Sequence, residues 1–117
     1  MSYLLLVVEP PEQRTERTAE EGRQAYAGML RFAEDLKARG VLRASESLTS
    51  TRDGVRLRMH EGRRHLVDGP FTEAKEMIGG FFLLDCESRE EAVAIAAECP
   101  AAGWCTVEVR KVGPCWA

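Results

Sequence analysis

The sequence predicts an α+β protein in which an antiparallel sheet carries two helices on one face. Two observations lead to this fold class. Short apolar segments bounded by proline or glycine alternate with two segments of helical periodicity. Their order is strand, helix, strand, hairpin, strand, helix, strand. Because 117 residues suffice for one hydrophobic core but not two, we expect one domain over residues 1–117.

The predicted strands differ in how they are buried. Tyr3 to Val8 is a continuous apolar run that ends at two prolines, which is typical of a central strand buried on both faces. Gly79 to Asp85 contains four consecutive apolar residues and has the same character. Val41 to Leu48 is less regular, and Trp104 to Val112 alternates apolar with polar residues.

Helical spacing of apolar residues predicts helices over residues 18–39 and 88–99. Each begins at a capping-box pair and stops at a helix-terminating residue: Thr18 with Glu21 and Gly40 for the first helix, Ser88 with Glu91 and Pro100 for the second.

Residues 55–68 predict a β-hairpin with Glu61-Gly62 as a two-residue turn. This turn fixes the cross-strand pairs: His60 with Arg63, Arg58 with His65, Leu57 with Leu66, and Val55 with Asp68. Basic side chains then share one face of the hairpin, namely Arg56, Arg58, His60, Arg63 and His65. Asp68 lies on the opposite, apolar face, where a carboxylate needs a partner or a function.

Two strand-helix-strand units around an inserted hairpin are typical of the ferredoxin-like arrangement. Its helices cover only one face of the sheet, yet the central strands are apolar on both. The economical way to bury the second face is another copy of the chain, so we expect a homodimer.

Composition excludes several classes of protein. The net charge of −3 argues against nucleic acid as the main partner. No apolar run approaches the ~20 residues that span a bilayer, and the first strand does not resemble a signal peptide, so we expect a cytoplasmic protein. The four cysteines and two histidines show no metal-ligand spacing, and no phosphate-binding loop or nucleophile elbow is present. We therefore expect no metal and no cofactor, and small buried or half-buried thiols.

The segment from Asp68 to Phe81 is the best candidate for a site, because it places a turn, four ionisable side chains and the glycine pair Gly79-Gly80 between strands. Asp68 could serve as a general base or ligand anchor. It could equally accept hydrogen bonds from the backbone of Phe71 or Thr72, or cap a short helix over residues 72–77.

The following residues also allow two interpretations. Glu73 and Lys75 are either a solvated turn or part of a ligand site, in which Lys75 offsets a substrate carboxylate. Gly79-Gly80 either permits a bulge and close backbone contact or makes room for a ligand. The basic hairpin face is either solvated or binds an anionic partner.

From Asp68 to Phe82 the sequence DGPFTEAKEMIGGFF resembles the signature of the YCII-related, DGPF-domain family. Similarity extends to Tyr3-Leu4-Leu5, to residues 37–42 and to residues 107–110, and so covers nearly the whole chain. The resemblance implies a ferredoxin-like, dimeric α+β barrel with a cleft between sheet and helices. It also implies a bacterial, cytosolic origin and an association with sigma factors.

Some relatives in this family are similar to dehydrochlorinases and muconolactone-isomerase-like enzymes and work through a His and Asp pair. Asp68 is the counterpart of that Asp. The His of those relatives lies on the first helix, near the position of Met29, and no His occurs in this helix of the present chain. This departure argues against a His–Asp mechanism here.

Two hypotheses follow. The first is a dimeric cleft protein that binds or transforms a small organic acid or carbonyl compound by cofactor-free proton transfer. Asp68 would be the base, Lys75 and Glu73 would contact the ligand, and the Phe81 strand would form the apolar wall. The second is a regulatory module, acting beside a sigma factor, whose contact surface is the basic hairpin.

Overall fold

The computed structural model describes every residue from Met1 to Ala117. It is an α+β structure with one four-stranded antiparallel sheet, one separate hairpin and three helices. The elements have these bounds: β1 Ser2–Glu9, α1 Gln13–Glu16, α2 Ala19–Ala38, β2 Leu42–Ser47, β3 Val55–His60, β4 Arg63–Asp68, β5 Met77–Asp85, α3 Arg89–Glu98 and β6 Thr106–Lys111. Short 3-10 turns cover Thr51–Asp53 and Pro100–Gly103.

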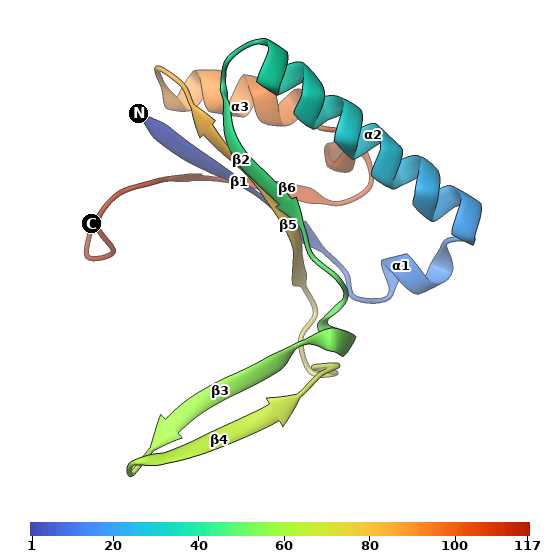
Figure 1. Cartoon of the computed structure of the whole chain (residues 1–117), viewed down its shortest axis with the longest axis vertical. Coiled ribbons are helices and arrows are strands. Elements are labelled where there is room, and N and C mark those ends of the chain that lie inside the picture. The colour runs from blue at the N-terminus through green and yellow to red at the C-terminus, as the bar shows by residue number, and fades with distance from the viewer.

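The sheet has the strand order β2-β5-β1-β6, which places the two most apolar strands at its centre. Figure 1 shows α2 and α3 on the same side of this sheet. The core lies between them and contains Leu5 and Leu84 from the central strands, Leu36 from α2 and Ile95 from α3, all at most 2% exposed. Burying such side chains contributes roughly 1.5–3 kcal/mol each.

Helix α2 begins as the sequence predicts. The Thr18 hydroxyl accepts from the Glu21 N–H, and the Glu21 carboxylate accepts from the Thr18 N–H. These hydrogen bonds lower the pKa of Glu21. At the other end Gly40 has a φ of +75°, the left-handed conformation that favours glycine after a helix.

The capping box predicted for helix α3 forms only in part. Ser88 caps it by accepting from the Glu91 N–H, but the Glu91 carboxylate accepts from the N–H of Glu87 and not from that of Ser88. The expected capping box is therefore displaced by one residue at its second hydrogen bond.

The hairpin register is confirmed at every predicted pair, from His60 opposite Arg63 to Val55 opposite Asp68. Glu61 and Gly62 both have positive φ, of 50° and 75°, as a type I′ turn requires. Figure 1 shows this hairpin extending away from the sheet and helices. Its apolar side chains consequently remain more than half exposed, among them Val55, Leu57 and Leu66.

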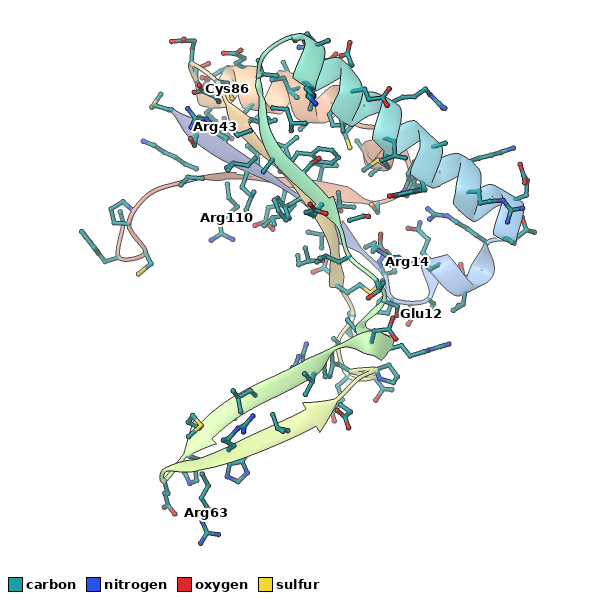
Figure 2. The ribbon with its side chains drawn as sticks, viewed as in Figure 1. Glu12, Arg14, Arg43, Arg63, Cys86 and Arg110 are labelled. Atoms are coloured by element: carbon teal, nitrogen blue, oxygen red, sulfur yellow. The ribbon has the colours of Figure 1, made fainter.

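The face of the sheet away from the helices is also apolar and only partly covered. Strand alternation and register place Leu4, Leu6, Phe81 and Leu83 on it. All four are half-buried, whereas the helix-facing residues between them are buried. Arg110, opposite Leu4, projects on this side of the sheet (Figure 2).

None of the helices is both long and apolar enough to cross a membrane.

Candidate functional site

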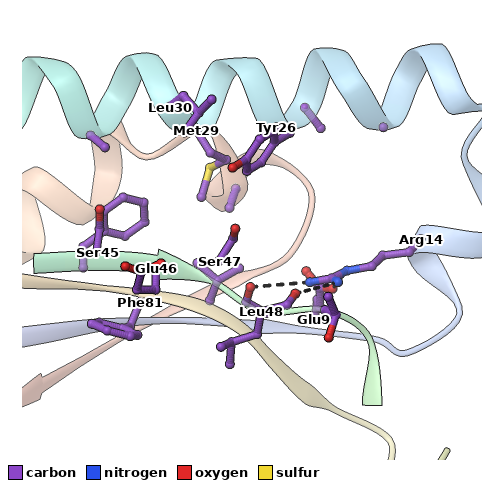
Figure 3. A pocket seen from close by; sticks show the side chains of 18 of the residues that line it. Glu9, Arg14, Tyr26, Met29, Leu30, Ser45, Glu46, Ser47, Leu48 and Phe81 are labelled. Carbon is purple, nitrogen blue, oxygen red and sulfur yellow. Dashed lines mark hydrogen bonds and ion pairs between the residues drawn. The ribbon is translucent and has the colours of Figure 1, made fainter. Parts of the chain in front are cut away.

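A cavity of about 490 Å³ lies between α2 and the sheet. Its walls are mainly apolar and aromatic, with Met29 and Tyr26 on α2, Phe82 on β5, and Trp104 before β6. Ser45 and Ser47 line it from β2, on the side of that strand that faces α2 (Figure 3). A concave, largely apolar space with a few polar groups is the usual form of a small-molecule site.

The polar end of the cavity contains a partly buried ion pair. Glu9, the last residue of β1, is 5% exposed and accepts a hydrogen bond of 2.5 Å from Arg14 Nε. Arg14 also donates to the carbonyl oxygens of Leu48, at 2.8 Å, and Gly79, at 3.4 Å. The guanidinium therefore ties the end of β1 to β2 and β5, and it fixes the carboxylate at the cavity wall (Figure 3).

Gly79 makes room for this pair. It is the extra residue of a β-bulge, because Val7 pairs with Gly80 whereas Val8 pairs with Ile78. A Cβ on Gly79 would lie 2.7 Å from Glu9 Oε2 and 2.9 Å from Arg14 Nη2. The predicted bulge is thus confirmed, and the close contact at Gly79 is with two charged side chains that line the cavity.

The aromatic wall carries a second arginine. The guanidinium of Arg17 lies 5.2 Å from the centre of the Trp104 ring, a cation–π contact. Gln13 Nε2, at the start of α1, donates to the Trp104 carbonyl at 2.6 Å, so α1 and the residue that follows it both contact Trp104. The pKa of the nearby Cys105 thiol is raised, chiefly by burial and also by the Glu9 charge and Cys99. The positive charge of Arg17 acts in the opposite direction. Arg17 and Glu9 both line the cavity.

The Asp68 carboxylate does not lie in this cavity. Asp68 ends β4 on the projecting hairpin, where its side chain is exposed and forms no hydrogen bond or ion pair. The expectation that Asp68 faces inward is wrong for the single chain, because the apolar hairpin face that it shares is not packed against the core. The expected backbone hydrogen bonds from Phe71 or Thr72 are absent. No helix forms over residues 72–77: a turn and a bend cover residues 72–75, and β5 begins at Met77.

Of the other predicted ligand-binding residues, one lines the cavity and two do not. Glu73 and Lys75 are exposed and do not line the cavity. Phe81 is among the lining residues, although its ring lies on the side of β5 away from α2 (Figure 3). Met29, on the first long helix, does line the cavity, and its sulfur lies 3.9 Å from Cys99 Sγ.

Sequence reasoning missed three charged residues that line the cavity, Glu9, Arg14 and Arg17. One signal was present, since a carboxylate that ends an otherwise apolar central strand has to be solvated or paired. Its partner could not be found in the same way, because Arg14 lies in a one-turn helix that the sequence does not predict.

All four cysteines are free thiols: Cys86 and Cys99 are buried, Cys105 is half-buried and Cys115 is exposed. Burial raises the pKa of Cys99 and of Cys86, as expected for thiols in apolar surroundings. No three His, Cys, Asp or Glu side chains are close enough to share a metal ion.

The fold and the cavity define a class: a small α+β protein with a half-open, largely apolar cavity between an antiparallel sheet and its longer helix. The family is given by sequence comparison, in which the model of the YCII-related domain matches residues 1–115. The chain therefore belongs to the YCII-related domain family, as its Asp68 to Phe82 signature predicts.

A curated relative is an uncharacterized protein of Rhizobium meliloti (strain 1021), with 39% identity over 59 residues. The aligned part covers 50% of the present chain and 48% of that protein, so the chain spans about half the length of this relative.

Proposed function

We propose that this protein binds a small organic acid or carbonyl compound in the cavity between α2 and the sheet. The observation that carries the proposal is the combination of apolar walls with a fixed polar end. A volume of about 490 Å³ falls within the range of roughly 300–1,000 Å³ for small-molecule sites. Ser45, Ser47 and Glu9 supply hydroxyl and carboxylate groups that could orient a ligand.

Glu9 is the group best placed for cofactor-free proton transfer. A general base must lie within hydrogen-bond reach of the proton that it removes, in a site that limits access of water. Glu9 lines the cavity from the helix-facing side of β1, and Arg14 holds only one of its two oxygens by a hydrogen bond. Asp68 could take part in the same chemistry only if it reached a cavity of another copy of the chain.

The binding proposal is tested by filling the cavity. Ala25 lines it from α2, and Ala25→Phe would occupy part of its volume. Ala94→Phe is the matched control, because Ala94 is exposed on α3. In a thermal-shift screen of small carboxylic acids, aldehydes and ketones, we expect at least one compound to raise the Tm of the wild type and of Ala94→Phe but not of Ala25→Phe. A stabilisation that persists in Ala25→Phe, or none with any compound, would contradict the proposal.

We further propose a homodimer with the ferredoxin-like, dimeric α+β barrel architecture. The strand order β2-β5-β1-β6 and the two strand-helix-strand halves support the ferredoxin-like topology. The half-buried row of Leu4, Leu6, Phe81 and Leu83 supports burial of the helix-free face by a second copy. In sedimentation equilibrium we expect the wild type to be a dimer and Leu6→Lys to be a folded monomer. A wild-type monomer at micromolar concentration would refute the proposed homodimer.

The basic hairpin favours a second candidate function, that of a regulatory module. Arg58, His60, Arg63 and His65 share one exposed face at the projecting end of the chain, and Arg63 marks its tip in Figure 2. Such a face suits an acidic protein surface, for example on a sigma factor. If this is the main function, Arg58→Glu with Arg63→Glu should abolish partner binding while Ala25→Phe leaves it unchanged.

A further inference from the structure

The charged groups around the cavity are not all neutralised within the chain. Four charged residues line it, namely Glu9, Arg14, Arg17 and Glu46. Glu9 and Arg14 pair with each other. Glu46 lies opposite Phe81 in the register, and strand alternation points its side chain to the helix-free face. Arg17 is left as the uncompensated charge on the helix side.

Arg17 is also held in a defined place with its donors unused. Its guanidinium contacts the Trp104 ring and takes part in no hydrogen bond and no ion pair. Glu21, whose carboxylate feels the Arg17 charge, accepts its hydrogen bond from the Thr18 N–H instead. A guanidinium held over an aromatic ring keeps its donors available for a planar, bidentate anion.

We propose that Arg17 is the anion-binding residue of the cavity and that its ligand is a monocarboxylate with an apolar or aromatic body. This inference rests on the proposed function and names the ligand class of the same site. The carboxylate binds the Arg17 guanidinium beside Trp104, and the apolar body extends along Met29, Tyr26 and Phe82. A singly charged acid is favoured over a dianionic phosphate, because Arg17 is the one unpaired guanidinium among the lining residues and the Glu9 carboxylate also lines the cavity.

The two tryptophans of the chain allow a direct test. Trp116 is 86% exposed and Trp104 lines the cavity, so Trp116→Phe leaves Trp104 as the only tryptophan reporter. In this background, 3-phenylpropanoate and the neutral 3-phenylpropanamide are titrated against Trp104 fluorescence, with calorimetry as a second measurement. The two compounds differ in charge but hardly in shape.

We expect the acid to bind at least tenfold more tightly than the amide, as an added charge-assisted pair implies. Arg17→Gln should remove this preference, whereas Arg23→Gln, which lies exposed on α2, should keep it. Arg17→Lys, which retains the charge without the planar fork, should keep part of it. Circular dichroism and thermal unfolding establish that each variant is folded.

The outcomes separate the two proposals. If both compounds bind with equal affinity and Ala25→Phe abolishes both, the cavity is a ligand site but the role of Arg17 is refuted. The role of Arg17 is also refuted if Arg17→Gln retains the preference for the acid. If neither compound binds to the wild type at millimolar concentration, the inference is overturned, and the proposed function then depends on the wider thermal-shift screen.

Discussion

Removal of Arg14 should destabilise the protein more than any other surface-accessible arginine substitution. Arg14→Met keeps the aliphatic stem but leaves the Glu9 carboxylate buried without its ion partner, and it deprives the Leu48 carbonyl of a donor. Breaking a buried ion pair by removing one partner costs about 3–5 kcal/mol. Because the Arg14 side chain is 31% exposed and that of Glu9 only 6%, water can replace part of the lost interaction. We therefore expect a loss of about 2–4 kcal/mol in the free energy of unfolding.

The assay is urea unfolding of a double-mutant cycle. Arg14→Met, Glu9→Gln and the double variant are compared with the wild type, and Arg31→Met on the exposed face of α2 serves as the control. We expect the double variant to be less destabilised than the sum of the two single variants by at least ~1 kcal/mol. A loss below ~1 kcal/mol for Arg14→Met, or strict additivity, would refute the view that this pair holds the polar end of the cavity.

Gly79→Ala should cost about 1–3 kcal/mol in urea unfolding, because its Cβ would lie 2.7 Å from Glu9 Oε2; wild-type stability would show that the pair can move without loss. Cys115 should be the one rapidly reacting thiol of the native protein at pH 8, and Cys115→Ser should remove the fast phase. The other three thiols are protected, because Cys86 and Cys99 are buried, Cys105 is half-buried, and burial raises the pKa of all three. A second fast thiol would contradict the protection of the other three cysteines by burial. Arg43 lowers the pKa of Asp85 below its unfolded value, so this carboxylate adds stability above about pH 4 that is lost as the pH falls through the folded pKa. Asp85→Asn should flatten the fall of the melting temperature below pH 4, and an unchanged acid limb would exclude that contribution.

Features with local causes could be predicted from the sequence. The capping box of Thr18 and Glu21 lies within four residues, and the left-handed residue Gly40 follows directly after the helix. The hairpin register follows from a two-residue turn, because Glu61 and Gly62 both adopt positive φ. In each case the decisive interactions are between residues close in sequence.

The polar end of the cavity could not be predicted, because its contacts join distant segments. Glu9 and Arg14 are near each other in sequence, but the space for their pair is made by the bulge at Gly79, and the second acceptor is the Leu48 carbonyl. Asp68 illustrates the opposite failure. Its register was predicted correctly, yet the location of the hairpin relative to the core is a tertiary property, and in the single chain the carboxylate lies in solvent.

We propose that the ligand site is the cavity between α2 and the sheet and not the Asp68 segment. Amide chemical-shift mapping with 3-phenylpropanoate tests it most directly. We predict the largest shifts at Arg17, Ala25, Met29 and Ser47, which line the cavity, and little change over residues 68–75. Shifts concentrated at Asp68, Glu73 and Lys75, with the cavity residues unchanged, would contradict the account.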